Sequence, residues 1–190
     1  MTSNILKTIG ARNDALEDRQ INDFYATEPK AVELLLEKEC FSKKILEPAC
    51  GMGHISNVLK HHGYDVYSYD IINRGYGKTE DFFDRQYFDG DIITNPPYKI
   101  ALPFLEHALN VINTGNKVAL FLRILFLEGK ARGKFFKNNP PKKIYIASGR
   151  LNCAKNGDFE KYKKSTAQAY AWFVWEKGFC GATSLDWINI

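Results

Sequence analysis

The chain has 190 residues, of which 45% are hydrophobic and 25% are charged, and its formal net charge is +4. This length predicts a single domain spanning 1–190, and the composition excludes collagen-like and low-complexity proteins. Because no apolar run approaches the roughly 18 residues that cross a bilayer and the polar N-terminus lacks a signal-peptide core, we expect a cytoplasmic protein with no membrane contact.

Strand-like and helix-like segments alternate along the chain. The predicted strands are 43–49, 64–70, 91–94, 116–123, 142–148 and 169–176. The predicted helices are 54–63, 101–113 and a third that follows Arg123 and ends near Phe136. This alternation is typical of an α/β fold, in which a mainly parallel sheet carries helices on both faces. The segments 1–22 and 149–167 are the least regular, and no linker divides the chain.

Ligands of such sheets bind at the carboxyl ends of the strands. After the first predicted strand comes a turn with two glycines, Glu47-Pro48-Ala49-Cys50-Gly51-Met52-Gly53. Glycines let a ligand approach the backbone closely, but Ser56 replaces the third glycine of the dinucleotide fingerprint. The acid that begins the turn would repel a pyrophosphate and suits a cation. The turn therefore favours S-adenosylmethionine (SAM), which carries a sulfonium and an ammonium, over NAD, although an ordinary tight turn has the same pattern.

Two further acids follow the next strands. Asp70 ends the second predicted strand, about twenty residues past the glycines, where a nucleoside cofactor places its ribose hydroxyls. For Asp70 alone, a helix cap or a turn residue is the alternative. Asp81 offers an acceptor for an adenine amino group and Phe82 an apolar plate for its ring, although Phe82 could equally be a core residue. The glycine turn and Asp70 together favour a nucleoside cofactor.

The segment Asn95-Pro96-Pro97-Tyr98 directly follows a buried strand. An exocyclic amino group on a conjugated ring, such as adenine N6, is a poor nucleophile because its lone pair is delocalised. The Asn95 side-chain oxygen and the Pro96 carbonyl offer acceptors for both amino hydrogens and for the positive charge that develops on methylation. The two prolines hold this corner rigid without a competing N–H, and Tyr98 offers a face for the substrate ring. We interpret the segment as catalytic rather than as a proline-stabilised turn.

Charge and cysteine patterns indicate which partners to expect. The segment 123–164 holds twelve Lys or Arg residues against three acidic ones. A basic block beside an acidic body suggests a polyanionic partner, nucleic acid first, although charge alone fits a solvated face equally well. The four cysteines form no C-x-x-C pair, so we expect reduced thiols and no metal site.

Taken in order, these motifs resemble those of the SAM-dependent DNA adenine-N6 methyltransferases with an NPPY motif, especially the compact phage and prophage enzymes. The resemblance covers nearly the whole chain, and NPPY is its most specific part. The segment 23–32 resembles the N-terminal motif that holds the methionine end of the cofactor, which implies contacts from Tyr25 and Thr27. Thr27 also suits a helix N-cap with Pro29 in the first turn.

The resemblance implies a Rossmann-like class I methyltransferase with a mainly parallel, seven-stranded sheet in which 169–176 is the antiparallel strand. The implied substrate is adenine N6 in DNA, contacted by 123–164. The implied cofactor-binding residues are Tyr25, Thr27, Glu47, Pro48, Ala49, Cys50, Gly51, Gly53, Asp70, Ile71, Asp81, Phe82 and Asn95. The implied catalytic residues are Asn95, Pro96, Pro97 and Tyr98.

The chain departs from this family in two ways. Such enzymes usually carry an aromatic residue, before the final hairpin, that holds the flipped base from the second side. Cys153 stands near that place, and Phe159 or Tyr162 could substitute only by folding inward. No separate target-recognition domain follows the sheet, so we expect a short or loose recognition sequence or a partner subunit that supplies specificity.

Three alternatives to this reading remain open. The same NPPY chemistry serves enzymes that methylate RNA bases or a glutamine side chain of release factors, although the glutamine enzymes usually carry an additional N-terminal helical domain. A non-catalytic nucleic-acid-binding module could retain the sheet as a scaffold, but the intact Asn95, Gly51 and Gly53 argue against it. An oxidoreductase is the least favoured, because Glu47 and the missing third glycine do not suit a pyrophosphate.

Overall fold

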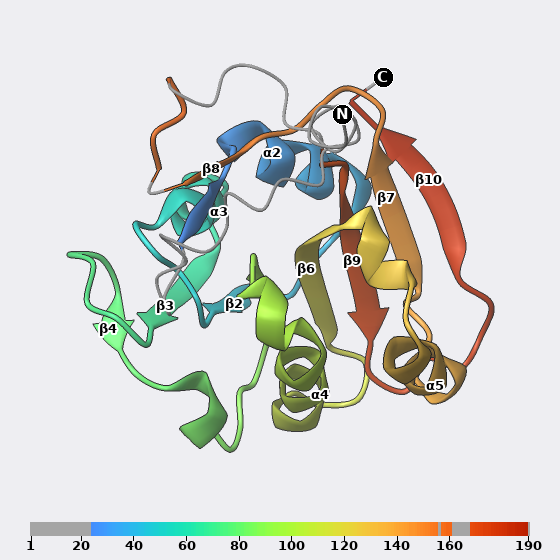
Figure 1. The fold of residues 1–190 in the computed structure, drawn as a ribbon. Helices are drawn as coiled ribbons and strands as arrows, with labels where there is room; N and C mark the ends of the chain where they lie inside the picture. The colour runs from blue at the N-terminus through green and yellow to red at the C-terminus, as the bar shows by residue number, and fades with distance from the viewer. Residues whose placement is uncertain (1–23, 156, 161–167, 190) are drawn as a thin grey trace, which may run out of the picture.

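The computed structural model describes residues 24–155, 157–160 and 168–189. Within these residues the chain forms a main sheet of eight strands and a small sheet of two (Figure 1). The main sheet contains β2 (Lys44–Glu47), β3 (Asp65–Asp70), β4 (Lys78–Thr79), β5 (Asp91–Thr94), β6 (Lys117–Arg123), β7 (Lys143–Ala147), β9 (Tyr170–Glu176) and β10 (Ser184–Ile188). The small sheet pairs β1 (Tyr25–Thr27) antiparallel with β8 (Cys153–Lys155).

The strand order of the main sheet is β10-β7-β9-β6-β5-β2-β3-β4. Neighbouring strands are parallel except around β9, which runs antiparallel to both β6 and β7. The α/β fold, the mainly parallel sheet and the antiparallel strand at 169–176 are therefore confirmed. The sheet has eight strands rather than seven, because β10 is added at the edge beside β7. Most residues of β10 are exposed, so its sequence carries no burial pattern that predicts a strand.

Four α-helices and three 3-10 turns connect the described strands. The helices are α2 (Pro29–Lys38), α3 (His54–His61), α4 (Ala101–Val111) and α5 (Lys130–Asn138), and the turns are η1 (Phe82–Asp84), η2 (Tyr98–Ile100) and η3 (Ile124–Leu127). The helix expected after Arg123 is divided into η3 and α5, because Gly129 adopts φ +119°, which no helix contains. Pro29 lies in the first turn of α2 as expected, but the N-cap is Glu28 rather than Thr27, which belongs to β1.

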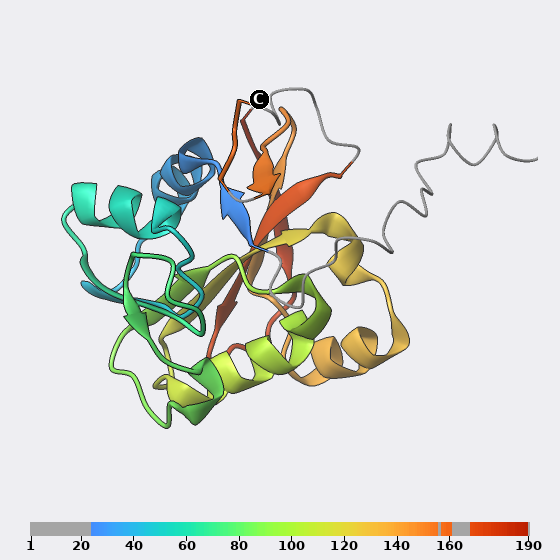
Figure 2. The same cartoon turned by 60° about the vertical axis from the view of Figure 1, so that its left-hand side comes forward.

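Two hydrophobic clusters fill the two faces of the main sheet. Helices α2 and α3 lie on one side of the sheet and α4 and α5 on the other (Figure 2). Strand β9 serves both clusters, since Phe173 faces the α4 side and Trp172 the α2 side. The buried Trp172 indole donates to the Ala31 carbonyl at 2.7 Å, which ties α2 to the centre of the sheet. Because helices cover both faces, ligands have access at the ends of the strands.

Candidate active site

The predicted cofactor turn and the predicted catalytic corner lie at the same edge of the main sheet. Strand β2 pairs with β3 on one side and with β5 on the other. The strand order therefore reverses at β2: the chain first adds β3 and β4 on one side and then returns to add β5 on the other. A ligand crevice is expected at such a switch point, beyond the carboxyl ends of the strands. The glycine turn follows β2, Asp70 ends β3, and Asn95 follows β5. The strand order thus brings together three motifs that are far apart in sequence.

Aromatic rings lie against both glycines of the turn. Gly51 (φ +53°) and Gly53 (φ +81°) have left-handed backbones, which favour glycine. A Cβ added to Gly51 would stand 1.9 Å from the Phe24 ring, and one added to Gly53 would stand 2.4 Å from the Tyr76 ring. Only glycine meets both requirements, so the turn presents bare backbone beneath two rings.

Asp70 connects the end of β3 to the glycine turn. Its Oδ2 accepts a hydrogen bond from the Gly51 backbone N–H at 2.8 Å, and its Oδ1 accepts one from the Ile72 N–H at 2.9 Å. The carboxylate is buried, whereas the next side chain, Ile71, is exposed. Each oxygen retains a second lone pair, so an acceptor and an apolar side chain stand together beside the turn.

Glu47 lies inside the protein beneath the turn that Pro48, Ala49 and Cys50 form. It is 1% exposed and accepts a hydrogen bond from the Ser56 hydroxyl of α3. Burial raises the pKa of the Glu47 carboxyl to about 8, although the Ser56 bonds oppose this shift. Burial likewise raises the pKa of the Cys50 thiol to about 12. Both groups are therefore largely neutral near pH 7 and hold β2 against the neighbouring segments.

Asp81 and Phe82 have mainly structural contacts. The Asp81 carboxylate accepts from the Phe83 backbone N–H at 2.9 Å and caps η1. The Phe82 ring is buried, with its centroid 4.5 Å from that of Phe104 and 4.8 Å from that of His107. Phe82 thus occupies a core position, and Phe83 is the exposed ring of this segment.

The Asn95 carboxamide is held in one orientation by the small sheet. Its Nδ2 donates to the Tyr25 carbonyl oxygen of β1 at 2.9 Å and contacts the Cys153 sulfur of β8 at 3.7 Å. Because a carbonyl oxygen can only accept, the nitrogen must face β1 and Oδ1 must face away from it. The rigid Pro96–Pro97 pair follows directly, and Asn95 is half-buried. The corner therefore presents a fixed amide oxygen next to the Pro96 backbone carbonyl. Because prolines have no N–H, the corner adds no backbone donor that would compete for these acceptors.

Tyr98 completes the corner and has several neighbours. Its hydroxyl lies 3.5 Å from the Cys153 sulfur, its ring stacks near that of Tyr25 with centroids 6.3 Å apart, and the Arg123 guanidinium lies 4.9 Å above it. Burial raises the pKa of Tyr98 well above its usual range, that of Cys153 to about 11 and that of Tyr170 to about 12. These three groups stay protonated near neutral pH, so Arg123 is the charged group at the corner.

Five buried polar atoms near these motifs have no partner among the described residues. They are Thr27 Oγ1 and His54 Nδ1 beside the glycine turn, and at the predicted catalytic corner Thr94 Oγ1, Arg123 Nε and Asn152 Oδ1 are likewise without one. Thr27 lies opposite Cys153 in the β1–β8 ladder, and His54 follows Gly53 at the start of α3. Leaving a buried polar atom unpaired costs about 1–3 kcal/mol, so Thr27 Oγ1 and His54 Nδ1 suit a polar ligand that reaches the glycine turn.

Four residues at this edge were given no role in the site from the sequence: Phe24, Tyr76, Arg123 and Tyr170, of which Arg123 belongs to the predicted basic segment 123–164. Arg123 ends β6 and Tyr170 begins the antiparallel β9, where the two face each other in register. Both residues could have been predicted from the sequence, because functional residues gather at the carboxyl ends of parallel strands and the antiparallel β9 begins at that end of the sheet. Phe24 lies within the segment 23–32 that resembles the N-terminal cofactor motif, but its place on Gly51, like that of Tyr76 on Gly53, depends on the packing of distant segments.

The region predicted to substitute for the missing aromatic is only partly described. Cys153 contacts both Asn95 and Tyr98, whereas the Phe159 ring lies 5.5 Å from the His54 ring, beside the glycine turn. Tyr162 lies outside the described residues, as do Lys161, Lys163 and Lys164 of the basic segment. Within the described part of 123–164, four basic residues and no acid lie on α5.

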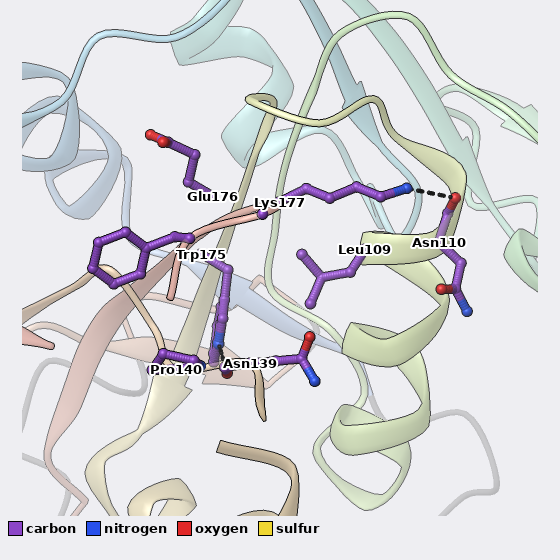
Figure 3. Close-up of a pocket in the computed structure, with 9 residues that line it drawn as sticks. Leu109, Asn110, Asn139, Pro140, Trp175, Glu176 and Lys177 are labelled. Atoms are coloured by element: carbon purple, nitrogen blue, oxygen red, sulfur yellow. Dashed lines mark hydrogen bonds between the residues drawn. The ribbon is translucent and has the colours of Figure 1, made fainter. Parts of the chain in front are cut away.

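A pocket lies at the opposite edge of the sheet, between α4 and the end of β9 (Figure 3). Its lining residues are Leu109, Asn110, Asn139, Pro140, Trp175, Glu176, Lys177, Gly178 and Phe179. The Lys177 ammonium donates to the Asn110 and Ile112 carbonyls, at 3.3 Å and 2.7 Å, and Glu176 accepts from Lys142 at 2.6 Å. These charged groups are satisfied within the protein, and none of the predicted site residues lines the pocket.

Three further features limit the chemistry of the described part. Among its helices, none combines the length and apolar character needed to cross a membrane. Its side chains include no group of three or more His, Cys, Asp or Glu placed to hold a metal ion. All four cysteines, Cys40, Cys50, Cys153 and Cys180, fall within it and are unpaired.

No protein-family model matches the sequence, and no curated protein matches it. Solved structures match in fold. A Listeria monocytogenes protein assigned as a class I SAM-dependent methyltransferase has 14% identity and a TM-score of 0.52, over 85% of this chain and 63% of its own. A modification subunit assigned to a type I restriction enzyme of Vibrio vulnificus has 12% identity and a TM-score of 0.56, over 94% and 49%. A Pyrococcus horikoshii protein assigned as an RNA methyltransferase has 14% identity and a TM-score of 0.53, over 79% and 80%.

At these identities the comparison establishes the fold, which is that of the Rossmann-like methyltransferases. The predicted fold class is thereby confirmed. The chain spans less than two thirds of the first two of these structures.

Proposed function

We propose that the chain transfers a methyl group from SAM to an exocyclic amino group, and that the substrate is adenine N6 in DNA. The observation that carries this proposal is the Asn95 carboxamide, whose nitrogen is bound to the Tyr25 carbonyl at 2.9 Å, so that Oδ1 is directed away from β1. It stands at the edge where β2 and β3 bring the glycine turn and Asp70. An acceptor fixed in advance beside a nucleoside-type turn is what methylation of an amino group requires.

The chemistry follows from these acceptors. Bound SAM supplies an electrophilic methyl group. Asn95 Oδ1 and the Pro96 carbonyl accept hydrogen bonds from the two amino hydrogens of the substrate, which draws the nitrogen lone pair out of conjugation. As the N–CH3 bond forms, the S–CH3 bond of the cofactor would break and S-adenosylhomocysteine would leave. The nitrogen becomes positive, the preoriented oxygens stabilise that charge, and loss of one amino proton to water gives the neutral product. Because Asn95 is neutral, it does not retain the cationic product as a carboxylate would.

Different residues around the glycine turn would bind different parts of the cofactor. The second lone pairs of the buried Asp70 carboxylate would accept from the ribose hydroxyls, and the exposed Ile71 would pack against the adenine ring. Thr27 Oγ1 and His54 Nδ1, which have no partner among the described residues, would bind the charged amino-acid end. The Phe24 ring lies directly against Gly51, so a ligand would reach the bare backbone of Gly51 by taking the place of that ring.

A nucleic-acid substrate is supported by charge and by the fold comparisons. Helix α5 carries four basic residues and no acid. The Vibrio structure is assigned as a modification subunit of a type I restriction enzyme, which favours DNA. RNA is the second candidate, because the structure from Pyrococcus is assigned as an RNA methyltransferase and matches 79% of this chain.

The test is transfer of labelled methyl groups from SAM to duplex DNA, single-stranded DNA, RNA and protein in parallel, followed by mass spectrometry of the nucleosides. We expect N6-methyladenine from DNA. Incorporation into protein glutamine, or N4-methylcytosine as the product, would overturn the assigned substrate. Binding of nucleic acid without any transfer would favour a non-catalytic module.

A further inference from the structure

Exposed apolar side chains lie on two turns at the carboxyl edge. Leu125 (64% exposed) and Leu127 (41%) belong to η3, and Ile100 (39%) ends η2. Turn η2 begins at Tyr98, and the Arg123 guanidinium, directly before η3, lies 4.9 Å from the centre of the Tyr98 ring. This contact places the two turns beside each other at the corner proposed to hold the substrate base.

Leu125 is fixed close to that corner. Consecutive Cα atoms are 3.8 Å apart, so the Leu125 backbone lies within about 7.6 Å of that of Arg123. The Ile124 N–H donates to the Ala169 carbonyl at 3.0 Å, and Phe126 is buried in the cluster on the α4 side. The residues on both sides are anchored, so Leu125 is held at the surface rather than carried on a loose loop.

Positive charge frames these apolar side chains. Helix α5 follows η3 and carries Lys130, Arg132, Lys134 and Lys137. Arg132 lies over the Phe126 ring at 5.3 Å, which connects α5 to η3. Glu128, which caps η3, is the one acid between this turn and the basic helix α5. An exposed leucine with Arg123 before it and a basic helix after it complements a partner with an anionic exterior and an apolar stacked interior, which describes duplex nucleic acid. The complementarity is poorer for a neutral protein surface.

Building on the proposed function, we propose that Leu125 inserts into duplex DNA at the place that the target base leaves. A base inside a duplex must be extruded before its amino group can reach Asn95, and extrusion costs unpairing and unstacking. An apolar wedge between base steps restores part of the stacking that extrusion removes, as leucine and methionine do in proteins that kink DNA. The substrate class is therefore duplex DNA, with α5 on the adjacent phosphates.

The test compares methyl transfer to adenine-unmethylated genomic duplex DNA with transfer to the same DNA after heat denaturation into single strands. The variants are Leu125→Ala, Leu125→Met, which keeps an apolar side chain of similar volume, and Leu185→Ala. The last is the matched control, because Leu185 is an exposed leucine (45%) on the edge strand β10. Since Leu125 is exposed, its replacement should leave the melting temperature of the protein unchanged.

We expect Leu125→Ala to lower the ratio of duplex to single-strand kcat/KM about tenfold, because a single strand has no gap to fill. Leu125→Met should keep the ratio within about twofold of wild type, and Leu185→Ala should not change it. An unchanged ratio in Leu125→Ala would overturn the insertion while leaving the proposed function standing. The insertion would also be overturned if methyl transfer required a second protein and Leu125→Ala abolished the binding of that protein. Absence of transfer to either form of DNA by the wild-type chain would overturn the proposed function itself.

Discussion

Replacement of Cys153 by alanine removes two interactions that orient the proposed catalytic corner. The sulfur lies 3.7 Å from Asn95 Nδ2 and 3.5 Å from the Tyr98 hydroxyl. A neutral hydrogen bond contributes about 0.5–1.5 kcal/mol, and long interactions with sulfur, a weak acceptor, belong at the low end of that range. If both interactions hold Asn95 in its transition-state orientation, the variant should lose about 1 kcal/mol there. That loss corresponds to a kcat about fivefold lower, with the Kd for SAM unchanged.

The assay is steady-state methyl transfer at saturating cofactor, with calorimetry of SAM binding alongside. Cys153→Ser retains an acceptor and should recover most of the lost kcat. Cys180→Ala changes an exposed thiol and serves as the control. The positioning role would be refuted if Cys153→Ala kept kcat within about twofold of wild type. It would also be refuted if the alanine and serine variants lost kcat equally while cofactor binding weakened.

Three further predictions test other parts of the site. Asp70→Ala should weaken SAM binding by roughly 1.5–3 kcal/mol, the value of a hydrogen bond to a charged group, and an unchanged calorimetric Kd would contradict the ribose role. The folded-state pKa of Glu47, about 8, lies above its ordinary value of 4.5, so its contribution to stability is present below pH 4.5 and is lost as pH rises toward 8. The free energy of unfolding should fall by up to about 1.4 kcal/mol per pH unit. Urea unfolding from pH 5 to 9 should show this fall, and Glu47→Gln should make the free energy of unfolding less dependent on pH. Replacing Lys130, Lys134 and Lys137 by Glu should weaken DNA binding. The slope of log affinity against log salt should become shallower by about 0.9 for each phosphate that α5 no longer neutralises. An identical slope would show that α5 does not contact the DNA.

Burial explains which strands could be predicted from the sequence. The segments that became β5, β6 and β9 are almost continuously buried, so their apolar runs predict strands directly. The strands β1, β4 and β8 have only two or three residues each, too few for any periodicity. Short strands of this kind exist because a partner strand aligns them.

The same distinction applies to the site. Asn95, Gly51 and Asp70 could be found because each follows or ends a strand, and the sheet order then brings them to one edge. The orientation of the Asn95 carboxamide could not be found, because it depends on the pairing of β1 with β8, two segments from opposite ends of the chain. The stacking of Arg123 on Tyr98 likewise arises from side-chain packing across neighbouring strands.

The most direct test of the central claim is the rate at which Asn95→Ala forms N6-methyladenine in DNA, measured by nucleoside mass spectrometry beside wild type at saturating SAM. The carboxamide oxygen acts on charge that develops only in the transition state, so we expect the rate to fall on the order of 10²–10³-fold, as for loss of one preorganised hydrogen-bonding group. The Kd for SAM should change far less. Methylation by Asn95→Ala at the wild-type rate would contradict the claim and leave the Asn-Pro-Pro-Tyr corner as only a turn.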